Sequence, residues 1–419
     1  MLPALRLALV GFAALSVGLP IIFISAAKLT LFLGAAALLI FESRTASQSS
    51  PLQGLWLPTA ILAALSFMAL SMLWTSASGQ QAAHALAKHA KLLTIPILIA
   101  LIRSRREAMI ALTLYTAGQL LLLGGSYLLV LGVPLPWAPV RTPDRVYALF
   151  SSYLDQSVIT AIFAALCWHL RPLLHRSRWR QLPVLVSGLA LVCVFFVFQG
   201  RTGHLVAIAM LSLMIMWELP RRWRVAALAA PLLVLAALSI GSEKIHARFN
   251  LLAHEVQAFA SDGVINSSSG LRLNLWHRAT QTMAEHPLVG SGVGSWEHEF
   301  ARLERSQGTD PAVDLGANPH QEYLLWGVEL GALGLILLVA VLLCAWRDTL
   351  SMEPNVRRAQ QSVIVGLSVA ALFNCTLYDA LIGDFFCVTL GVLLALGRQL
   401  LSEPAAREPS RYTHDLAAT

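Results

Sequence analysis

A histidine stands where a long polar segment gives way to an apolar run. His320 follows Pro319 at the end of the polar stretch 241–319 and begins the run 320–346. Proline favours the first turn of a helix, so we expect His320 in that turn. The positive end of the helix dipole disfavours an imidazolium, and a neutral imidazole can act as a general base. A histidine that merely hydrogen-bonds a neighbour is the alternative.

Two glycines follow His320 at helical spacing. Gly331 lies eleven residues on, about three turns along the same face, and Gly334 lies on nearly the same face. Small residues allow close approach of another helix. We therefore expect the His320 face to point into a bundle of helices.

Two arginines suit phosphate binding. Arg201 lies in a tight turn and begins a helix. The positive end of the helix dipole disfavours a cation there, so we expect an anion nearby that offsets the charge of Arg201. A structural carboxylate and a ligand phosphate both fit. Arg272 shares a predicted helical stripe with Trp276, Ala279 and Met283. A guanidinium binds phosphate oxygens bidentately, although a solvated loop arginine is the alternative.

Further cations are weaker candidates for the same site. Lys88 and Lys91 precede the apolar run 91–102, and either could contact a ligand or lie as a snorkelling anchor. Arg141 and Arg145 are loop charges of the same uncertain kind.

Three carboxylates complete the candidates. Glu329 lies inside an apolar run, where an ionisable group is a functional hypothesis, and a buried interhelical hydrogen bond is the alternative. Asp379 and Asp384 flank the last turn between apolar runs and could orient a base or bind a sugar.

Several motifs are absent from the sequence. It has no Walker A motif, no dinucleotide-binding motif and no Asp-x-Asp pair for a metal on a sugar nucleotide. Gly290, Gly292 and Gly294 predict a turn-rich segment, and a phosphate-binding loop is the weaker interpretation because no strand precedes it. The energy for chemistry would then arrive with the substrate, as it does with a lipid diphosphate.

The elements that must position these residues are membrane helices. Of the 419 residues, 57% are hydrophobic and 13% charged, which indicates an all-α integral membrane protein. About twelve apolar runs are near spanning length: 5–24, 26–41, 55–73, 91–102, 108–130, 153–170, 182–198, 203–219, 225–240, 320–346, 361–379 and 381–400. The five cysteines lie in apolar runs and read as small hydrophobic residues.

Arginine clusters in alternate connections predict the orientation. They fall on one side if every run spans, and the positive-inside rule makes that side, with both termini, cytoplasmic. The formal charge of +7 therefore serves orientation and does not imply nucleic acid. We expect nine helices in 1–240, a partly helical outer loop at 241–319, three helices in 320–400 and a disordered tail at 401–419.

Several motifs resemble those of bacterial O-antigen ligases. Arg201 to Leu205 resembles their R-x3-L element, and His320-Gln321 with Gly331 and Gly334 fits H-[NSQ]-x9-G-x2-[GTY] throughout. Residues 269–292 are similar to the loop signature of the wider ligase and polymerase superfamily, and 373–379 also looks familial.

The resemblance implies a GT-C type membrane glycosyltransferase. Such enzymes move O-antigen polysaccharide from undecaprenyl diphosphate onto lipid A-core at the periplasmic face of the bacterial inner membrane, without ATP, metal or cofactor. The family's two diphosphate-binding arginines carry over to Arg201 and Arg272, and its essential histidine to His320. A further family lysine carries over to Lys88 or Lys91.

Three other functions remain open on the sequence. An O-antigen polymerase and a protein O-oligosaccharyltransferase would use the same donor and a similar scaffold. A transporter or flippase would also have about twelve spans, but the chain shows neither two similar halves nor broken helices meeting at mid-membrane.

Overall fold

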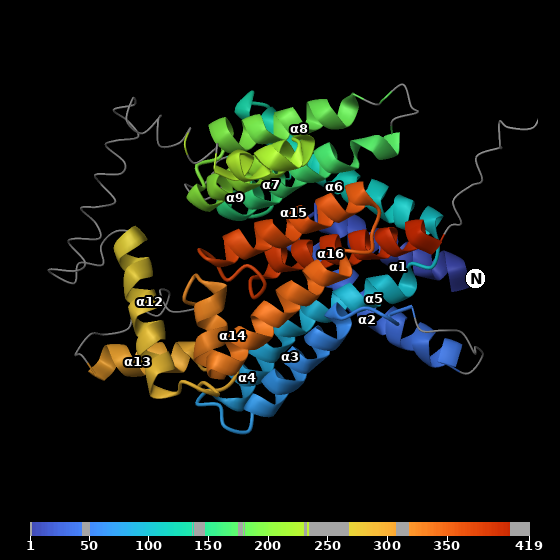
Figure 1. The fold of residues 1–419 in the computed structure, drawn as a ribbon. Helices are drawn as coiled ribbons and strands as arrows, with labels where there is room; N and C mark the ends of the chain where they lie inside the picture. The colour runs from blue at the N-terminus through green and yellow to red at the C-terminus, as the bar shows by residue number, and fades with distance from the viewer. Residues whose placement is uncertain are drawn as a thin grey trace, which may run out of the picture.

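A computed structural model describes residues 2–43, 51–135, 137, 147–174, 179, 181–229, 233, 268–306 and 318–402. The regular structure in these ranges is helical, without a strand (Figure 1). The all-α prediction is therefore confirmed for this part of the chain.

The first half of the chain supplies most of the helices. They are α1 (Leu2–Ser16), α2 (Ile21–Ser43), α3 (Leu57–Ser71), α4 (Gly79–His89), η1 (Ala90–Leu93), α5 (Thr94–Leu101), α6 (Arg105–Val130), α7 (Tyr153–Leu170), η3 (Arg171–Leu174), α8 (Leu182–Val192), the π-turn η4 (Cys193–Val197), α9 (Arg201–Glu218) and η5 (Arg221–Trp223). The second half adds α12 (Ser268–Glu285), α13 (Trp296–Ser306), α14 (Glu322–Asp348), α15 (Pro354–Ala371) and α16 (Ala380–Ser402).

Five segments are long and apolar enough to cross a membrane: Ile21–Leu38, Gly79–Leu101, Arg105–Val130, Glu322–Asp348 and Ala380–Leu401. Three shorter apolar helices, Pro3–Ser16, Leu57–Ser71 and Leu182–Val197, accompany them among the described residues. The chain is thus a membrane protein by composition and by helix length. The count of twelve spans and their orientation stay predictions.

Capping residues move several predicted boundaries. Ser78 forms a capping box with Gln81, so the helix expected at 91–102 begins at Gly79 as α4 and continues through η1 and α5. Glu353 accepts hydrogen bonds from the N–H groups of Asn355 and Val356, so the helix expected at 361–379 spans Pro354–Ala371. Most of the predicted run 225–240, the tail beyond 402 and much of the 241–319 loop lie outside the described residues, and the described part of the run, 225–229 and 233, is helical.

The helices form a bundle around α14, α15 and α16 (Figure 1). Helices α7, α8 and α9 lie on one side of this central group, and α3 and α4 lie on the other. Helices α12 and α13 lie beyond one end of the bundle. We call this the α12 end, and it also holds the starts of α9, α14 and α16.

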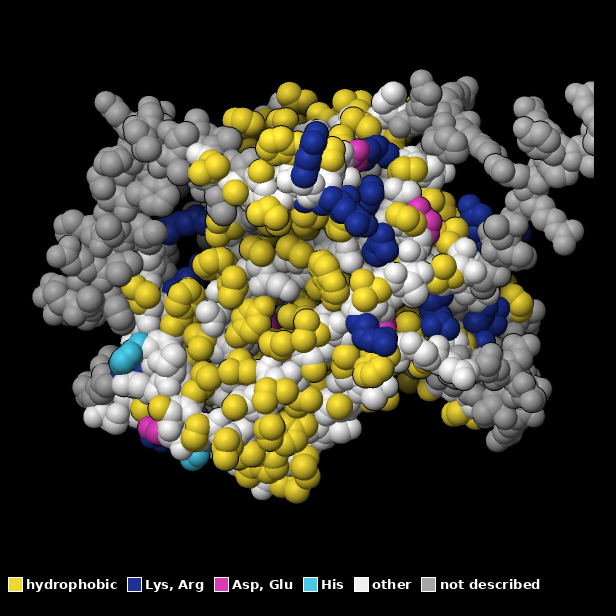
Figure 2. All heavy atoms as spheres, in the orientation of Figure 1, with side chains coloured by type: hydrophobic (Ala, Val, Ile, Leu, Met, Phe, Trp, Pro, Cys, Tyr) yellow, Lys and Arg dark blue, Asp and Glu magenta, His cyan; other side chains and the backbone are white. Residues whose placement is uncertain are grey.

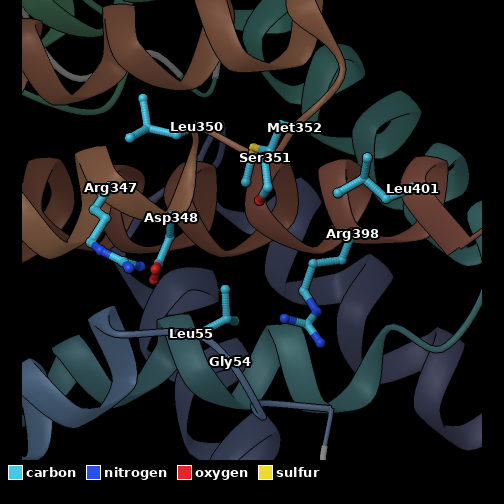
Figure 3. Close-up of a pocket in the computed structure, with 9 residues that line it drawn as sticks. All are labelled: Gly54, Leu55, Arg347, Asp348, Leu350, Ser351, Met352, Arg398 and Leu401. Carbon is cyan, nitrogen blue, oxygen red and sulfur yellow. The ribbon is translucent and has the colours of Figure 1, made fainter.

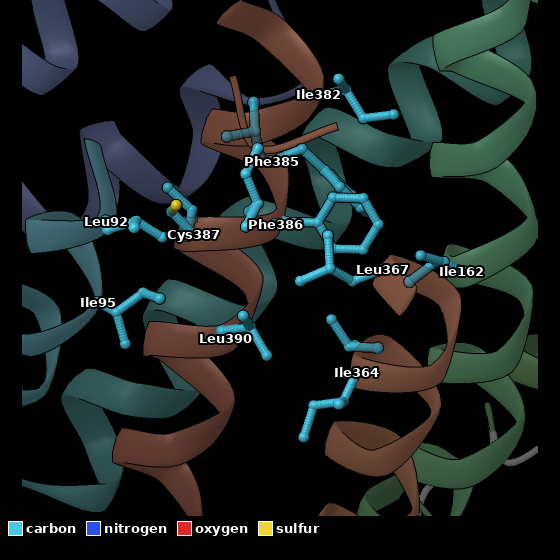
Figure 4. Packing of buried hydrophobic residues seen from close by; sticks show 14 of the residues in the cluster. Leu92, Ile95, Ile162, Ile364, Leu367, Ile382, Phe385, Phe386, Cys387 and Leu390 are labelled. Carbon is cyan, nitrogen blue, oxygen red and sulfur yellow. The ribbon is translucent and has the colours of Figure 1, made fainter. Parts of the chain in front are cut away.

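Helix α16 is the centre of the core. Its spanning window is 94% buried, against 28% for that of α2, which indicates that α16 is surrounded by protein. Phe385 and Phe386 meet edge to face, and Figure 4 shows these rings near Leu367 of α15 and Ile162 of α7. All five cysteines are free, and Cys387 is buried in this packing.

The outer surface is apolar around the bundle. Exposed hydrophobic side chains such as Ile336 and Leu343 lie along α14, and hydrophobic atoms cover much of the face in Figure 2. Lysine and arginine side chains in that view gather mainly toward the half that holds the N-terminus, away from the α12 end. This distribution fits a bundle whose two ends differ in charge.

Helix α14 is broken at Gly331, where φ is 65° and ψ is −151°. The loop that follows α12 docks at the break: Gly292 and Ser291 donate backbone hydrogen bonds to the carbonyls of Glu329 and Val328, at 2.8 and 2.9 Å. A Cβ on Gly331 would lie 2.5 Å from the carbonyl carbon of Leu288.

Gly331 and Gly334 are both buried, as expected for a face that points into the bundle, but their nearest neighbours are not another helix. A loop approaches Gly331, and a Cβ on Gly334 would meet the carbonyl of Trp326 in the preceding half of α14 itself. Gly290, Gly292 and Gly294 all have positive φ, as a turn-rich segment requires. They form the loop that fills the break.

Candidate functional site

His320 lies just outside its helix. Helix α14 begins at Glu322, and His320 has a left-handed φ of 49°, so the prediction that it lies in the first helical turn was wrong. The side chain of Asn318 stabilises this conformation by accepting a hydrogen bond from the His320 N–H at 2.9 Å. Burial and the nearby charge of Arg272 lower the pKa of the imidazole. The neutral form expected from the helix dipole therefore has a different physical cause.

Arg272 lies on α12, whose apolar stripe packs against the first half of α14. Trp276 donates its indole N–H to the carbonyl of Pro319 at 3.1 Å, and Met283 packs on Gly327. Ala279 is buried between these contacts. The predicted stripe thus faces α14, and the indole hydrogen bond ties α12 directly to the residue before His320.

Arg201 begins α9, as predicted, and reaches α12. Its guanidinium donates to the hydroxyl of Ser269 at 3.3 Å. Burial and the charge of Arg201 lower the pKa of the Arg272 guanidinium, so the two cations are neighbours. Neither forms an ion pair with a carboxylate among the described residues.

These contacts bring three separate segments together. The start of α9, the first turns of α12 and the loop before α14 place Arg272 within electrostatic reach of both Arg201 and His320. A pair of cations beside a neutral imidazole can bind an anion and accept a proton next to it.

Asp379 joins this group through Asn318. The Asn318 amide donates to the Asp379 carboxylate at 3.3 Å while its oxygen accepts from the His320 N–H. Burial, with the charges of Asp155 and Glu322, raises the pKa of Asp379 to about 7. Asp379 is therefore linked to the backbone of His320 through the side chain of Asn318.

The two candidate lysines have different surroundings. Lys91 is 2% exposed and donates to the backbone carbonyls of Tyr378 and Asp379 at 3.0 and 2.6 Å. Lys88 lies with its ammonium 4.2 Å from the centroid of the Tyr378 ring and lines a polar cavity. Lys91 thus holds the turn before α16, and Lys88 is the lysine that faces open space.

Glu329 forms a buried interhelical hydrogen bond. Its carboxylate lies 3.1 Å from His89 Nε2 of α4 and accepts the N–H of Gly294 at 2.9 Å. The structural interpretation of this residue is therefore confirmed. Asp384 forms an ion pair with Lys28 of α2 at 2.7 Å, which joins α2 to α16. Arg141 and Arg145 lie outside the described residues.

Four residues around the site were missed by the sequence interpretation. Glu322 is fully buried and accepts backbone hydrogen bonds from Leu377 and Tyr378 at 2.8 and 3.3 Å, which fixes the turn that carries Asp379. His89, Asp155 and Lys28 are the others. Each is an ionisable side chain inside or beside an apolar run, and that placement was the available signal.

A second hollow lies at the opposite end of the bundle. It measures about 520 Å³, and Figure 3 shows Arg347 and Arg398 pointing toward the stretch at Gly54 and Leu55. Asp348 in its wall accepts the backbone N–H groups of Trp56 and Leu57 and so caps α3. This hollow shares no residue with the group around His320.

A metal site does not emerge from the described residues. No cluster of three or more His, Cys, Asp or Glu side chains there is arranged to hold a metal ion.

Comparison with known proteins gives one family match. Residues 185–339 match the family described as O-antigen ligase, and the match supports a place for this chain in the O-antigen ligase/polymerase family. Such membership indicates a membrane enzyme of the glycosyltransferase type that acts on lipid-linked glycans. The match covers less than half of the chain, and it contains Arg201, Arg272 and His320. No curated protein matches the chain.

Proposed function

We propose that this protein is an O-antigen ligase of the bacterial inner membrane. It transfers a polysaccharide from undecaprenyl diphosphate to a sugar hydroxyl of lipid A-core at the periplasmic face. The observation that carries the proposal is the meeting of Arg201, Arg272 and His320 from three separate segments, all within the matched region.

The arginine pair serves the leaving group. The bond between the anomeric carbon and the diphosphate oxygen breaks, and its electron pair stays on the diphosphate. Arg201 and Arg272 offset the growing negative charge there, as preorganised donors do at a developing anion. Cleavage of the donor's glycosyl–diphosphate bond supplies the free energy, so the step needs no ATP, and the arginine pair takes the place of a metal ion.

His320 serves the nucleophile. An acceptor hydroxyl is a weak nucleophile until its proton moves to a base, and the lowered pKa of His320 keeps the imidazole neutral and ready to accept it. The acceptor oxygen then bonds to the anomeric carbon from the face opposite the diphosphate. The product has inverted configuration.

The first experiment replaces the base. His320→Ala, purified and supplied with lipid donor and lipid A-core, should lose about 10²–10⁴-fold in rate. His277→Ala is the matched control, because His277 is exposed on α12. A His320→Ala rate within about threefold of wild type would remove the histidine from the chemistry.

The second experiment tests the clamp. Arg201→Lys keeps the charge but loses the planar fork, so both donor affinity and rate should fall. Unchanged values for both would mean that Arg201 is structural.

The acceptor decides between related reactions. Transfer to lipid A-core supports the ligase, extension of a lipid-linked glycan would show a polymerase, and transfer to a protein hydroxyl would show an O-oligosaccharyltransferase. Donor-dependent transfer by the protein in detergent would exclude a pure transporter.

A further inference from the structure

A separate polar cavity lies beside the candidate site. It measures about 300 Å³ and lies between α4, the start of α13 and the first turns of α14. Its lining includes Gln80, His84 and Lys88 from α4, Trp296 and Glu297 from α13, and Tyr378 from the turn before α16. Its volume is at the lower end of the range for small-molecule sites.

The lining combines aromatic surfaces with hydrogen-bonding groups. Amide, imidazole, carboxylate and ammonium groups surround Trp296 and Tyr378. Such a wall can pack on the C–H faces of a pyranose ring while its polar groups bond to the hydroxyls. The indole N–H of Trp296 is buried and has no hydrogen-bond partner among the described residues.

The charge of the cavity argues against a phosphate. Lys88 contributes one cation, while Glu297 and Glu329 also line the space. An anion would meet these carboxylates, whereas a neutral polyhydroxyl ligand would not. The two unpaired guanidiniums that suit a diphosphate lie elsewhere, on α9 and α12.

The cavity and Arg201 belong to opposite sides of the central helices. Helix α4 lies on one side of α14 and α16, and α9 lies on the other (Figure 1). Tyr378 of the cavity wall precedes Asp379, which accepts from Asn318, and Asn318 accepts from the His320 N–H. The turn that carries Tyr378 is thus connected, through Asp379 and Asn318, to the backbone of His320.

We propose that this cavity binds a pyranose unit of the acceptor glycan and presents the acceptor hydroxyl to His320. The assignment to the acceptor rests on the proposed function, whereas binding of a pyranose does not. Lys88, His84 and Glu297 hold the hydroxyls, and Tyr378 and Trp296 form the apolar wall.

Comparing the acceptor KM with the donor KM and kcat tests the assignment of the cavity to the acceptor. His84→Ala and Glu297→Ala should each raise the acceptor KM roughly tenfold, the loss of about one hydrogen bond, and leave donor KM and kcat unchanged. The matched control is His298→Ala, because His298 is exposed on α13 beside the cavity but does not line it. An unchanged acceptor KM in both cavity variants, or an equal rise in the control, overturns the assignment.

A binding measurement tests the cavity without the reaction. Saturation-transfer NMR on full-length His320→Ala should show contact with methyl glucopyranoside or methyl galactopyranoside and none with mannitol, an acyclic polyol. The signal should vanish when His84→Ala and Glu297→Ala are combined and persist with His298→Ala. Absence of a pyranoside signal, or its survival in the double cavity variant, overturns the proposal.

The kinetic and the binding measurements distinguish a failure of the sugar-site proposal from a failure of the proposed transferase function. Pyranoside binding without any glycan transfer would keep the cavity and remove the transferase. Transfer with unaltered kinetics in the cavity variants would keep the transferase and remove the sugar site.

Discussion

At the scale of single residues, the surroundings of His320 decide its chemistry. Its imidazole is partly buried, lies near the charge of Arg272 and is held by a left-handed backbone that Asn318 stabilises. Desolvation and a neighbouring cation both disfavour the imidazolium. The residue therefore stays a proton acceptor down to a lower pH than an ordinary histidine does.

This predicts the acidic limb of the pH profile. In wild type, kcat/KM should fall only below the ordinary histidine pKa of 6.5. Arg272→Gln should move the limb to higher pH because one cause of the lowered pKa disappears, while Arg272→Lys should leave the limb in place. The measurement is kcat/KM against pH, normalised to each variant's plateau. A limb that does not move in Arg272→Gln would contradict the electrostatic link.

Asp379 predicts a pH dependence of stability. Its pKa rises from 3.8 to about 7 on folding, so the folded state holds the proton more tightly than the unfolded state. Between these values the folded state binds more protons, and stability falls as pH rises. Asp379→Asn removes this loss, so the variant should gain stability relative to wild type at pH 8 and show little difference at pH 4. Thermal unfolding in detergent at both pH values measures it, and a gap that does not grow with pH contradicts it.

At the scale of elements, the break in α14 ties the loop after α12 to the helix that follows His320. Gly331 occupies a backbone region that only glycine adopts readily, and the loop supplies the hydrogen bonds to the carbonyls of Val328 and Glu329. Glu329 completes the junction through Gly294 and His89. The arrangement fixes α12, and with it Arg272, relative to the start of α14.

Replacing Gly331 should therefore be costly. Gly331→Ala should destabilise the fold by about 3 kcal/mol or more. The backbone strain alone costs about 1–3 kcal/mol, and the new Cβ of the alanine would also clash with the backbone of Leu288. Gly124→Ala in α6 is the control, because its Cβ would meet open space and alanine favours a helix by about 0.5–1 kcal/mol. Thermal unfolding of both variants in detergent is the measurement. Equal effects would mean that the break is not rigidly held.

At the scale of the whole molecule, the two ends of the bundle differ. The α12 end carries the site, and the ends of α14 and α16 carry Arg347 and Arg398. The positive-inside rule then predicts that the α12 end faces the periplasm.

Cysteine labelling tests this orientation. With a membrane-impermeant maleimide on spheroplasts, His298→Cys at the α12 end should react, because its side chain is 52% exposed. Leu350→Cys, 57% exposed near the end of α14, should react only after permeabilisation. Wild-type protein with its five native cysteines gives the background. Labelling of Leu350→Cys from outside would invert the topology and exclude a periplasmic site.

The sequence by itself determined the helical class, the apolar faces and the choice of Arg201, Arg272 and His320 as candidates. Composition and period fix these features because burial depends on which residues are apolar and how they repeat. Long-range pairing escaped the sequence: Glu322 with the turn at Leu377, Asn318 between His320 and Asp379, and His89 with Glu329. These contacts depend on which distant segments meet, and local pattern carries no such information. The tertiary structure also broke α14 at Gly331, because the loop after α12 offers partners for the carbonyls that an unbroken helix would satisfy itself.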